Sequence, residues 1–156
     1  MQNLEQLKRS WYMFFFQHGL ADLVVGANNH AYIEMLWRDW SPGYDASFDL
    51  EAVKKSLADP KNLQAALGYY RATLGDGYRD PSLKALQDQM GSAVPTQPLL
   101  YLHGTNDGCI GAEVVEAAKS MAPANVNFAI VKDAGHFLQL EQPQKVNKLI
   151  CDFITG

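Results

Sequence analysis

Hydrophobic residues in the first part of the chain recur at helical spacing. Up to about residue 91, apolar side chains return every three or four positions, which is the period of an amphipathic α-helix. These positions are Leu4, Leu7, Trp11, Phe14 and Phe15, then Leu36, Trp37 and Trp40, then Leu50, Val53 and Leu57, and then Leu63, Leu67, Tyr70 and Leu74. Proline and glycine separate the groups, and Asp49 and either Asp59 or Pro60 are the expected helix starts. The pattern predicts consecutive helices without a strand.

The pattern changes after residue 91. Two short apolar runs, 98–103 and 126–131, are followed by segments with helical spacing at about 111–121 and 142–155. Apolar runs without alternation are typical of parallel strands that helices cover on both faces. The predicted fold class is therefore α/β, with a helical domain at 1–91 and part of a parallel sheet with flanking helices at 92–156.

Two parallel strands do not form a stable sheet by themselves. We expect the remaining strands to come either from a preceding segment of a longer protein or from self-association through the exposed strand edge. Met1 leads directly into an amphipathic helix, without a strand before it. This order favours a chain that is the C-terminal part of a larger protein.

Composition narrows the class of protein. The 156 residues carry a formal charge of −4, and no run of Lys or Arg offers the basic surface that a nucleic-acid partner requires. No apolar stretch approaches the roughly 20 residues of a membrane span, and the N-terminus lacks the order of a signal peptide. We therefore expect a soluble, cytoplasmic protein.

Cys109 and Cys151 fit neither a disulfide framework nor a zinc site, and Cys109 is expected to be a small packing residue.

An aspartate and a histidine follow the two predicted strands. Asp107 comes after the first strand and His136 after the second, 29 positions later. Neighbouring parallel strands end at the same edge of a sheet, so the two side chains are expected to meet there. The acid-then-base order is that of triad hydrolases, whose nucleophile comes earlier on a strained turn between a strand and a helix. Such a turn does not occur before Asp107, and the nearest strings, at 43–45 and 75–77, lack a strand in front.

Several strings of the sequence are characteristic of one superfamily. They are SWYMFFFQ at 10–17, LWRDWSPGY at 36–44, YYRA at 69–72, HGTND at 103–107, and GHF at 135–137 followed by Glu141 and Pro143. With these strings, the C-terminal region resembles the α/β-hydrolase superfamily. The helical region resembles the cap domain of the epoxide hydrolase-like branch of that superfamily. The resemblance covers nearly the whole chain.

The resemblance implies a division of catalytic roles. In epoxide hydrolases of this fold, two cap tyrosines donate hydrogen bonds to the epoxide oxygen, and an aspartate opens the ring to form an ester. A histidine, held by an acidic residue, then activates the water that hydrolyses the ester. The matching residues are Tyr12 and Tyr70, His136 as the base and Asp107 as its orienting acid. The nucleophile belongs to the N-terminal half of that fold, so the isolated chain is expected to be inactive.

The substrate would be a small molecule in a cleft between cap and sheet. Its walls are expected to be Trp11, Phe14, Phe15, Tyr70 and Phe137, with Tyr69 as the substitute for Tyr70. No cofactor and no metal are expected. His103 is expected to be structural, and His18 and His30 to be surface or packing residues.

Other functions stay open at this point. With an aspartate nucleophile, a haloalkanoate or haloalkane dehalogenase would fit the same residues, and with a serine, an esterase would. A protein of another class would also fit, namely a non-catalytic binding module that completes its sheet as a homo-oligomer.

Overall fold

The structure is a computed structural model that describes residues 3–90, 93 and 95–156. The contacts between Cα atoms divide the chain into two compact units. The sheet unit comprises Met1–Ser10, Met35–Ala46 and Thr96–Gly156, and the helical unit comprises Trp11–Glu34 and Ser47–Pro95. The predicted domain boundary between residues 91 and 92 lies outside the described residues.

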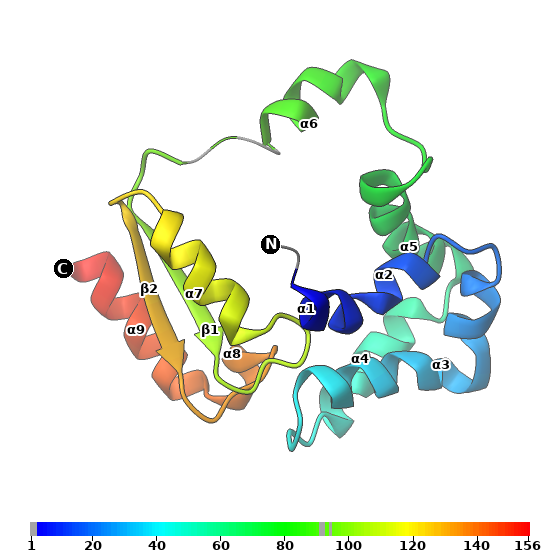
Figure 1. The fold of residues 1–156 in the computed structure, drawn as a ribbon. Helices are drawn as coiled ribbons and strands as arrows, with labels where there is room; N and C mark the ends of the chain where they lie inside the picture. The colour runs from blue at the N-terminus through cyan, green and yellow to red at the C-terminus, as the bar shows by residue number, and fades with distance from the viewer. Residues whose placement is uncertain (1–2, 91–92, 94) are drawn as a thin grey trace. The chain divides into compact units, whose positions relative to one another are not determined.

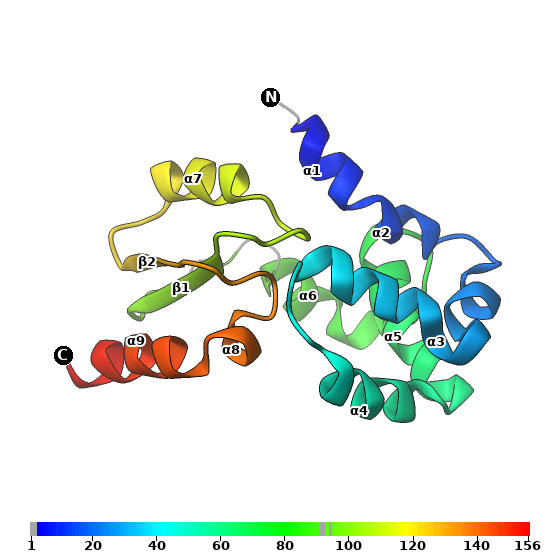
Figure 2. The same ribbon diagram turned by 90° about the horizontal axis from the view of Figure 1, so that it is seen from below.

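The sheet unit contains two parallel strands, β1 (Leu99–Gly104) and β2 (Val126–Val131). Leu99 lies opposite Val126 and Gly104 opposite Val131, without a bulge between them. Helix α7 (Ala112–Met121) covers one face of the strands, and α9 (Pro143–Thr155) covers the other (Figures 1 and 2). The short helices α1 (Leu4–Arg9) and α8 (Leu138–Glu141) complete the unit. The predicted α/β class is confirmed, and each predicted strand and helix lies within one or two residues of its observed position.

The core of the sheet unit lies between β2 and α9. Val131, Ala134 and Val146 are buried there, and Leu102, Leu138 and Leu149 pack against them. Helix α9 presents an apolar stripe to the strands because Val146, Leu149 and Phe153 return at helical spacing. Packing of this stripe holds the turn after β2, which carries His136, against the end of the sheet.

The helical unit is built from consecutive helices, as the hydrophobic pattern predicted. They are α2 (Trp11–Phe15), the first part of α3 (Ala21–Trp40), α4 (Ser47–Leu57), α5 (Pro60–Leu74), a 3-10 turn (Pro81–Leu83) and α6 (Lys84–Met90). No strand occurs among the described residues of this unit. Asp59 begins α5 as predicted, because its carboxylate accepts a hydrogen bond of 2.9 Å from the Lys61 backbone N–H. The predicted start at Asp49 is wrong, because α4 begins two residues earlier, at Ser47.

Helix α3 contains a break that the sequence pattern did not predict. Ala27 is extended, with ψ of 159°, and the next three residues have left-handed backbone angles. Their φ values are 50° at Asn28, 53° at Asn29 and 57° at His30. Asn and His tolerate this conformation better than most residues, but the apolar spacing on either side gives no sign of it.

None of the helices in the described part of the chain has the length and apolar composition that crossing a bilayer requires.

Candidate active site

Asp107 and His136 form a hydrogen-bonded pair at the carboxyl ends of β1 and β2. The Asp107 Oδ2 atom lies 3.0 Å from the His136 Nδ1 atom. The parallel register places Gly104 beside Val131, so the turns that follow the two strands emerge next to each other. The structure therefore brings together the two side chains that the sequence nominated as base and orienting acid. Their catalytic roles stay predictions.

The Asp107 carboxylate is buried, and both of its oxygen atoms accept hydrogen bonds. Only 8% of the residue is exposed, and its Oδ1 atom accepts hydrogen bonds from the backbone N–H groups of Cys109 at 2.7 Å and Ile110 at 2.8 Å. Burial by itself would raise the pKa of Asp107. The hydrogen bonds from His136, Ile110 and Cys109 outweigh burial and hold the pKa of Asp107 below its usual value. Asp107 is therefore a carboxylate at neutral pH.

This carboxylate determines the tautomer of His136. A carboxylate only accepts hydrogen bonds, so the His136 Nδ1 atom must carry the proton that it donates to Asp107. In the neutral ring, Nε2 then keeps its lone pair and can take a proton. The His136 side chain is 30% exposed, compared with 4% for Asp107. The pair thus has the buried acid and accessible imidazole of a general base.

The backbone of Trp40 ties the two turns together. Its carbonyl oxygen accepts hydrogen bonds from the Gly108 N–H at 3.0 Å and from the His136 N–H at 3.1 Å. Glycine is required at 108 because a Cβ there would overlap the Asp39 carbonyl oxygen. One carbonyl group therefore holds the turn that carries Asp107 and the turn that carries His136 close to each other.

A buried Ser41–Glu141 contact supports the histidine turn. The Ser41 hydroxyl donates to Glu141 Oε1 at 2.8 Å, and it accepts from the Phe137 N–H at 3.1 Å. The other oxygen, Glu141 Oε2, accepts from the Gly135 N–H at 2.8 Å. Only 2% of Ser41 is exposed. The sequence showed Glu141 as part of a characteristic string, but nothing in it pointed to Ser41 as its partner.

Aromatic rings flank His136 within the sheet unit. Trp37 stacks on Phe137 with ring centroids 3.9 Å apart, and Trp40 meets His136 edge-on at 5.3 Å. Phe137 was predicted to line the substrate cleft, and the structure places it next to the candidate base, at 5.3 Å between ring centroids. These rings restrict the orientation of the imidazole and surround it with apolar surface.

The two candidate tyrosines lie together in the helical unit. The rings of Tyr12 on α2 and Tyr70 on α5 meet edge-on with centroids 5.8 Å apart, and Phe16 packs against both at 5.5 and 4.9 Å. Tyr12 is buried, whereas Tyr69, the substitute considered for Tyr70, is 82% exposed. The structure therefore favours Tyr70 over Tyr69 as the partner of Tyr12.

A third phenol, Tyr32, belongs to the same aromatic cluster. Its ring stacks on Phe15 at 5.5 Å and packs near Phe16 at 6.0 Å and Trp11 at 5.9 Å. Its hydroxyl is buried and has no hydrogen-bond partner among the described residues. Burial raises the pKa of Tyr32 to about 12. No separate signal in the sequence pointed to Tyr32, which lies in a helical segment without a recognisable string.

The remaining predicted cleft residues are more exposed. Trp11 is 44% exposed and Phe14 59%, while Phe15 is intermediate. The structure thus groups the predicted residues in two sets. Asp107, His136 and Phe137 belong to the sheet unit, and Trp11, Tyr12, Phe14, Phe15 and Tyr70 belong to the helical unit.

His103 has a structural contact in the sheet unit. Its Nε2 atom lies 3.1 Å from the Ile110 carbonyl oxygen and must donate to it. In the neutral ring, Nδ1 then lacks a proton, and it lies 3.9 Å from Asp107 Oδ2. His103 is therefore a buried neighbour of the candidate acid, and it is not a second donor to it.

Among the described residues, no group of three or more potential ligands is placed to hold a metal ion.

Several known proteins are similar to this chain in sequence or in fold. No protein-family model matches the sequence. Epoxide hydrolase 4 from Homo sapiens is 29% identical over 154 residues, which cover 95% of this chain and 40% of the human protein. Carboxylesterase YbfK from Bacillus subtilis is 29% identical over 129 residues, covering 67% of this chain and 44% of that protein. The crystal structure of the Cif epoxide hydrolase from Acinetobacter nosocomialis superposes with a TM-score of 0.66 at 19% identity, covering 92% of this chain and 44% of that one.

The chain therefore spans well under half the length of these relatives, although the relatives match most of the chain. The matched region includes the strings that carry Tyr12, Tyr70, Asp107 and His136. Sequence and fold agree with each other: over most of its length the chain is similar to epoxide hydrolases, and its fold is that of part of an α/β hydrolase.

Proposed function

We propose that the complete protein is a cofactor-independent hydrolase that opens epoxides. The observation that carries the proposal is the buried Asp107 carboxylate bonded at 3.0 Å to the Nδ1 atom of an accessible His136. The Tyr12–Tyr70 pair supports an epoxide as the substrate, because two neighbouring phenols can donate to one oxygen. The names of relatives such as epoxide hydrolase 4 support the same class.

In the proposed reaction, an aspartate from a segment outside these 156 residues attacks one epoxide carbon. The C–O bond of the ring breaks, and negative charge develops on the epoxide oxygen. Tyr12 and Tyr70 stabilise this charge, and one phenol gives its proton to the oxygen. The product of this step is an ester between the aspartate and the opened substrate.

His136 acts in the second step. Its Nε2 atom takes a proton from water while the water oxygen attacks the carbonyl carbon of the ester. Asp107 stabilises the imidazolium that forms, and it keeps the ring oriented. The ester C–O bond then breaks, and the second proton of the attacking water passes to the departing alkoxide, which releases the diol and regenerates the aspartate carboxylate. The proton on His136 returns through solvent to the phenolate. One water is consumed for each epoxide.

We further infer that a preceding segment of the same protein completes the sheet. In the described residues, β1 pairs only with β2. An apolar groove of about 550 Å³ lies beside β1 and α9, lined by residues that include Leu100, Leu102, Ile150 and Phe153. The relatives are more than twice as long as the region that they share with this chain, so they possess further chain that could supply strands. The chain by itself is expected to lack hydrolase activity.

Isotope labelling tests the proposed chemistry. The complete protein is incubated in excess over styrene oxide in H₂¹⁸O, and the diol is analysed after a single turnover. Through an aspartyl ester, the first diol contains oxygen from the protein and not from the labelled water. Direct incorporation of ¹⁸O into the first diol would contradict the ester mechanism, and no turnover of epoxides would refute the proposed activity.

A carboxylesterase is the second candidate, and the similarity to carboxylesterase YbfK favours it. An esterase would use the same Asp107–His136 pair with a serine nucleophile and would form an acyl-enzyme. The complete protein would then hydrolyse p-nitrophenyl acetate but not styrene oxide. Release of halide from a haloalkane or haloalkanoate would instead indicate a dehalogenase. An oligomer that turns over none of these compounds would indicate a non-catalytic binding module.

A further inference from the structure

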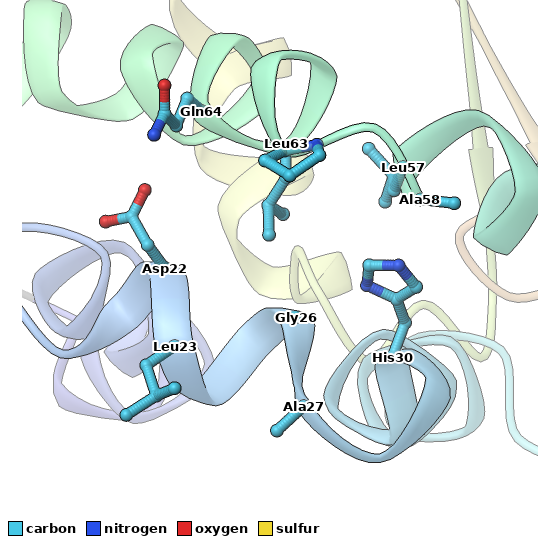
Figure 3. A pocket seen from close by; sticks show the side chains of 10 residues that line it. Asp22, Leu23, Gly26, Ala27, His30, Leu57, Ala58, Leu63 and Gln64 are labelled. Atoms are coloured by element: carbon cyan, nitrogen blue, oxygen red, sulfur yellow. The ribbon is translucent and has the colours of Figure 1, made fainter.

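The helical unit contains a cavity that the proposed reaction does not use. It has a volume of about 320 Å³ and lies between the first part of α3, the end of α4 and the start of α5 (Figure 3). Its apolar lining includes Gly26, Ala27, Leu57 and Leu63. Tyr12 and Tyr70 are not among the residues that line it. The volume is within the range of sites that bind small molecules.

His30 is the buried polar residue of this cavity. Only 7% of it is exposed, and its Nδ1 atom lies 3.2 Å from the Val25 carbonyl oxygen. Since a carbonyl only accepts hydrogen bonds, Nδ1 must carry the proton. In the neutral ring, Nε2 is then an acceptor, and no described residue donates to it. Figure 3 shows the imidazole between α3 and the Leu57–Ala58 segment, among the side chains that line the cavity.

The break in α3 sets the position of this imidazole. Asn28, Asn29 and His30 all have left-handed backbone angles, each of which costs roughly 1–2 kcal/mol relative to a right-handed helix. Strain of this kind persists where the surrounding structure holds it, and it occurs often at ligand sites. Here the strained turn ends at the residue that faces the cavity.

The opposite end of the cavity is electrically neutral. The carboxylate of Asp22 is paired with the Arg71 guanidinium at 2.6 Å. Gly26 keeps the middle of the cavity open, because a Cβ at this position would lie only 3.2 Å from Leu63 Cδ2. An uncharged ligand with an apolar body therefore suits the site better than an ion.

We propose that this cavity binds a small aliphatic alcohol whose hydroxyl donates a hydrogen bond to His30 Nε2. The alkyl part of the ligand packs against Ala27, Leu57 and Leu63, and burial of its apolar surface provides most of the affinity. The hydroxyl selects the ligand, because none of the residues that the structure describes donates to Nε2. This site is independent of the proposed hydrolysis.

Two probes of equal size test the role of the hydroxyl. The full chain, labelled with ¹⁵N, is titrated with 1-hexanol and separately with methyl pentyl ether, which has the same number of heavy atoms but no donor. We expect 1-hexanol to bind about threefold to tenfold more tightly, which corresponds to one hydrogen bond. The amide resonances of Leu57 and Leu63 and the imidazole ¹⁵N resonance of His30 should shift together.

Two variants provide the controls. In His30→Asn, the side-chain amide can still donate to the Val25 carbonyl and tolerates the left-handed backbone, but the acceptor at Nε2 is lost. This variant should bind both probes equally. Ala58 is exposed at the rim, so Ala58→Phe should block the cavity for both probes without disturbing the core.

The titrations can also contradict the proposal. Equal affinity of the unmodified chain for alcohol and ether would refute it, as would unsaturable shifts or shifts confined to residues around Tyr12 and Tyr70. Retention of the alcohol preference in His30→Asn would also refute it. If His30→Asn does not fold, the comparison of the two probes and the Ala58→Phe variant still decide the question.

Discussion

The sheet unit and the helical unit differ in how completely their buried polar groups are hydrogen-bonded. In the sheet unit, Asp107 accepts three hydrogen bonds, and Ser41 and Glu141 satisfy each other and the turn around His136. In the helical unit, the Tyr32 hydroxyl is buried without a partner among the described residues, and His30 lines a cavity with no described residue bonded to its Nε2 atom. A satisfied network holds groups in one geometry, whereas a polar atom without a partner in the protein can form a hydrogen bond to a ligand or to water.

This difference agrees with the proposed mechanism, in which the sheet unit provides the general base and the helical unit recognises the substrate. A general base needs a fixed tautomer and a fixed orientation, and the sheet unit provides both for His136. Substrate recognition needs aromatic surface with hydroxyl donors, and the helical unit provides these around Tyr12 and Tyr70. Variants in the two units should therefore differ in the size and the kind of their effects.

The largest effect is expected from Asp107→Asn in the complete protein. The amide can retain the contacts to Cys109 and Ile110, but its NH₂ group would face His136 Nδ1 and favour the wrong tautomer. Hydrolysis should fall about 10³- to 10⁴-fold, measured as steady-state kcat. The matched control is Asp133→Asn in the turn that carries His136, where φ is 60° and Asn is tolerated. Full activity of Asp107→Asn would refute the role of Asp107.

A smaller loss is expected from Tyr70→Phe. The ring contacts with Tyr12 and Phe16 remain, but a hydroxyl donor to the epoxide oxygen is removed. Hydrolysis of styrene oxide by the complete protein should fall roughly 10²- to 10³-fold. The exposed neighbour provides the comparison, since Tyr69→Phe should retain normal kinetics. Equal losses in both variants would mean that Tyr70 has no special role in catalysis.

Ser41→Ala should affect stability more directly than chemistry. The Phe137 N–H and one oxygen of Glu141 lose their buried partner. We expect the free energy of unfolding of the chain to fall by about 1–3 kcal/mol, as measured by urea denaturation. Ser120→Ala in α7, where the serine is exposed, should change it by less than about 0.5 kcal/mol. A neutral Ser41→Ala variant would show that this contact does not support the turn around His136.

The smallest effect is expected from the pH dependence of the stabilisation that the Asp107 carboxylate contributes to the folded chain. Because the pKa of Asp107 is held below its usual value of 3.8, ionised Asp107 contributes its full stabilisation above that value. The contribution is lost as pH falls through the lowered pKa of the folded state. The difference in free energy of unfolding between the unmodified chain and Asp107→Asn should therefore shrink in acid. A difference that stays constant down to the acid limit of folding would contradict the lowered pKa.

Hydrophobic spacing alone predicted much of the fold. Strands need short apolar runs and helices need a period near 3.6, and both signals are local in this sequence. The pairing of Asp107 with His136 also followed, because parallel strands end at the same edge of a sheet. The start of α4 was misplaced by two residues because an acidic residue in the first turn of a helix, here Asp49, looks like a cap in the sequence.

Other features depended on contacts between distant segments. Ser41 lies 100 positions from Glu141, and no local pattern pairs a serine with a glutamate at such a separation. The break in α3 requires three residues to leave the helical region together, which neighbouring packing can impose but propensity does not predict. The cavity beside His30 is a property of the packing between three helices, so it has no counterpart in the sequence.

The sequence by itself determined the α/β class, the order of the helices and strands, and the presence of an aspartate and a histidine at adjoining strand ends. Only the tertiary structure decided which oxygen of Asp107 faces His136, that Tyr70 rather than Tyr69 joins Tyr12, and that the Tyr32 hydroxyl is buried without a partner among the described residues. The reason is physical. Periodicity and turn chemistry act between near neighbours in the chain, whereas burial and hydrogen-bond satisfaction depend on which distant segments pack together.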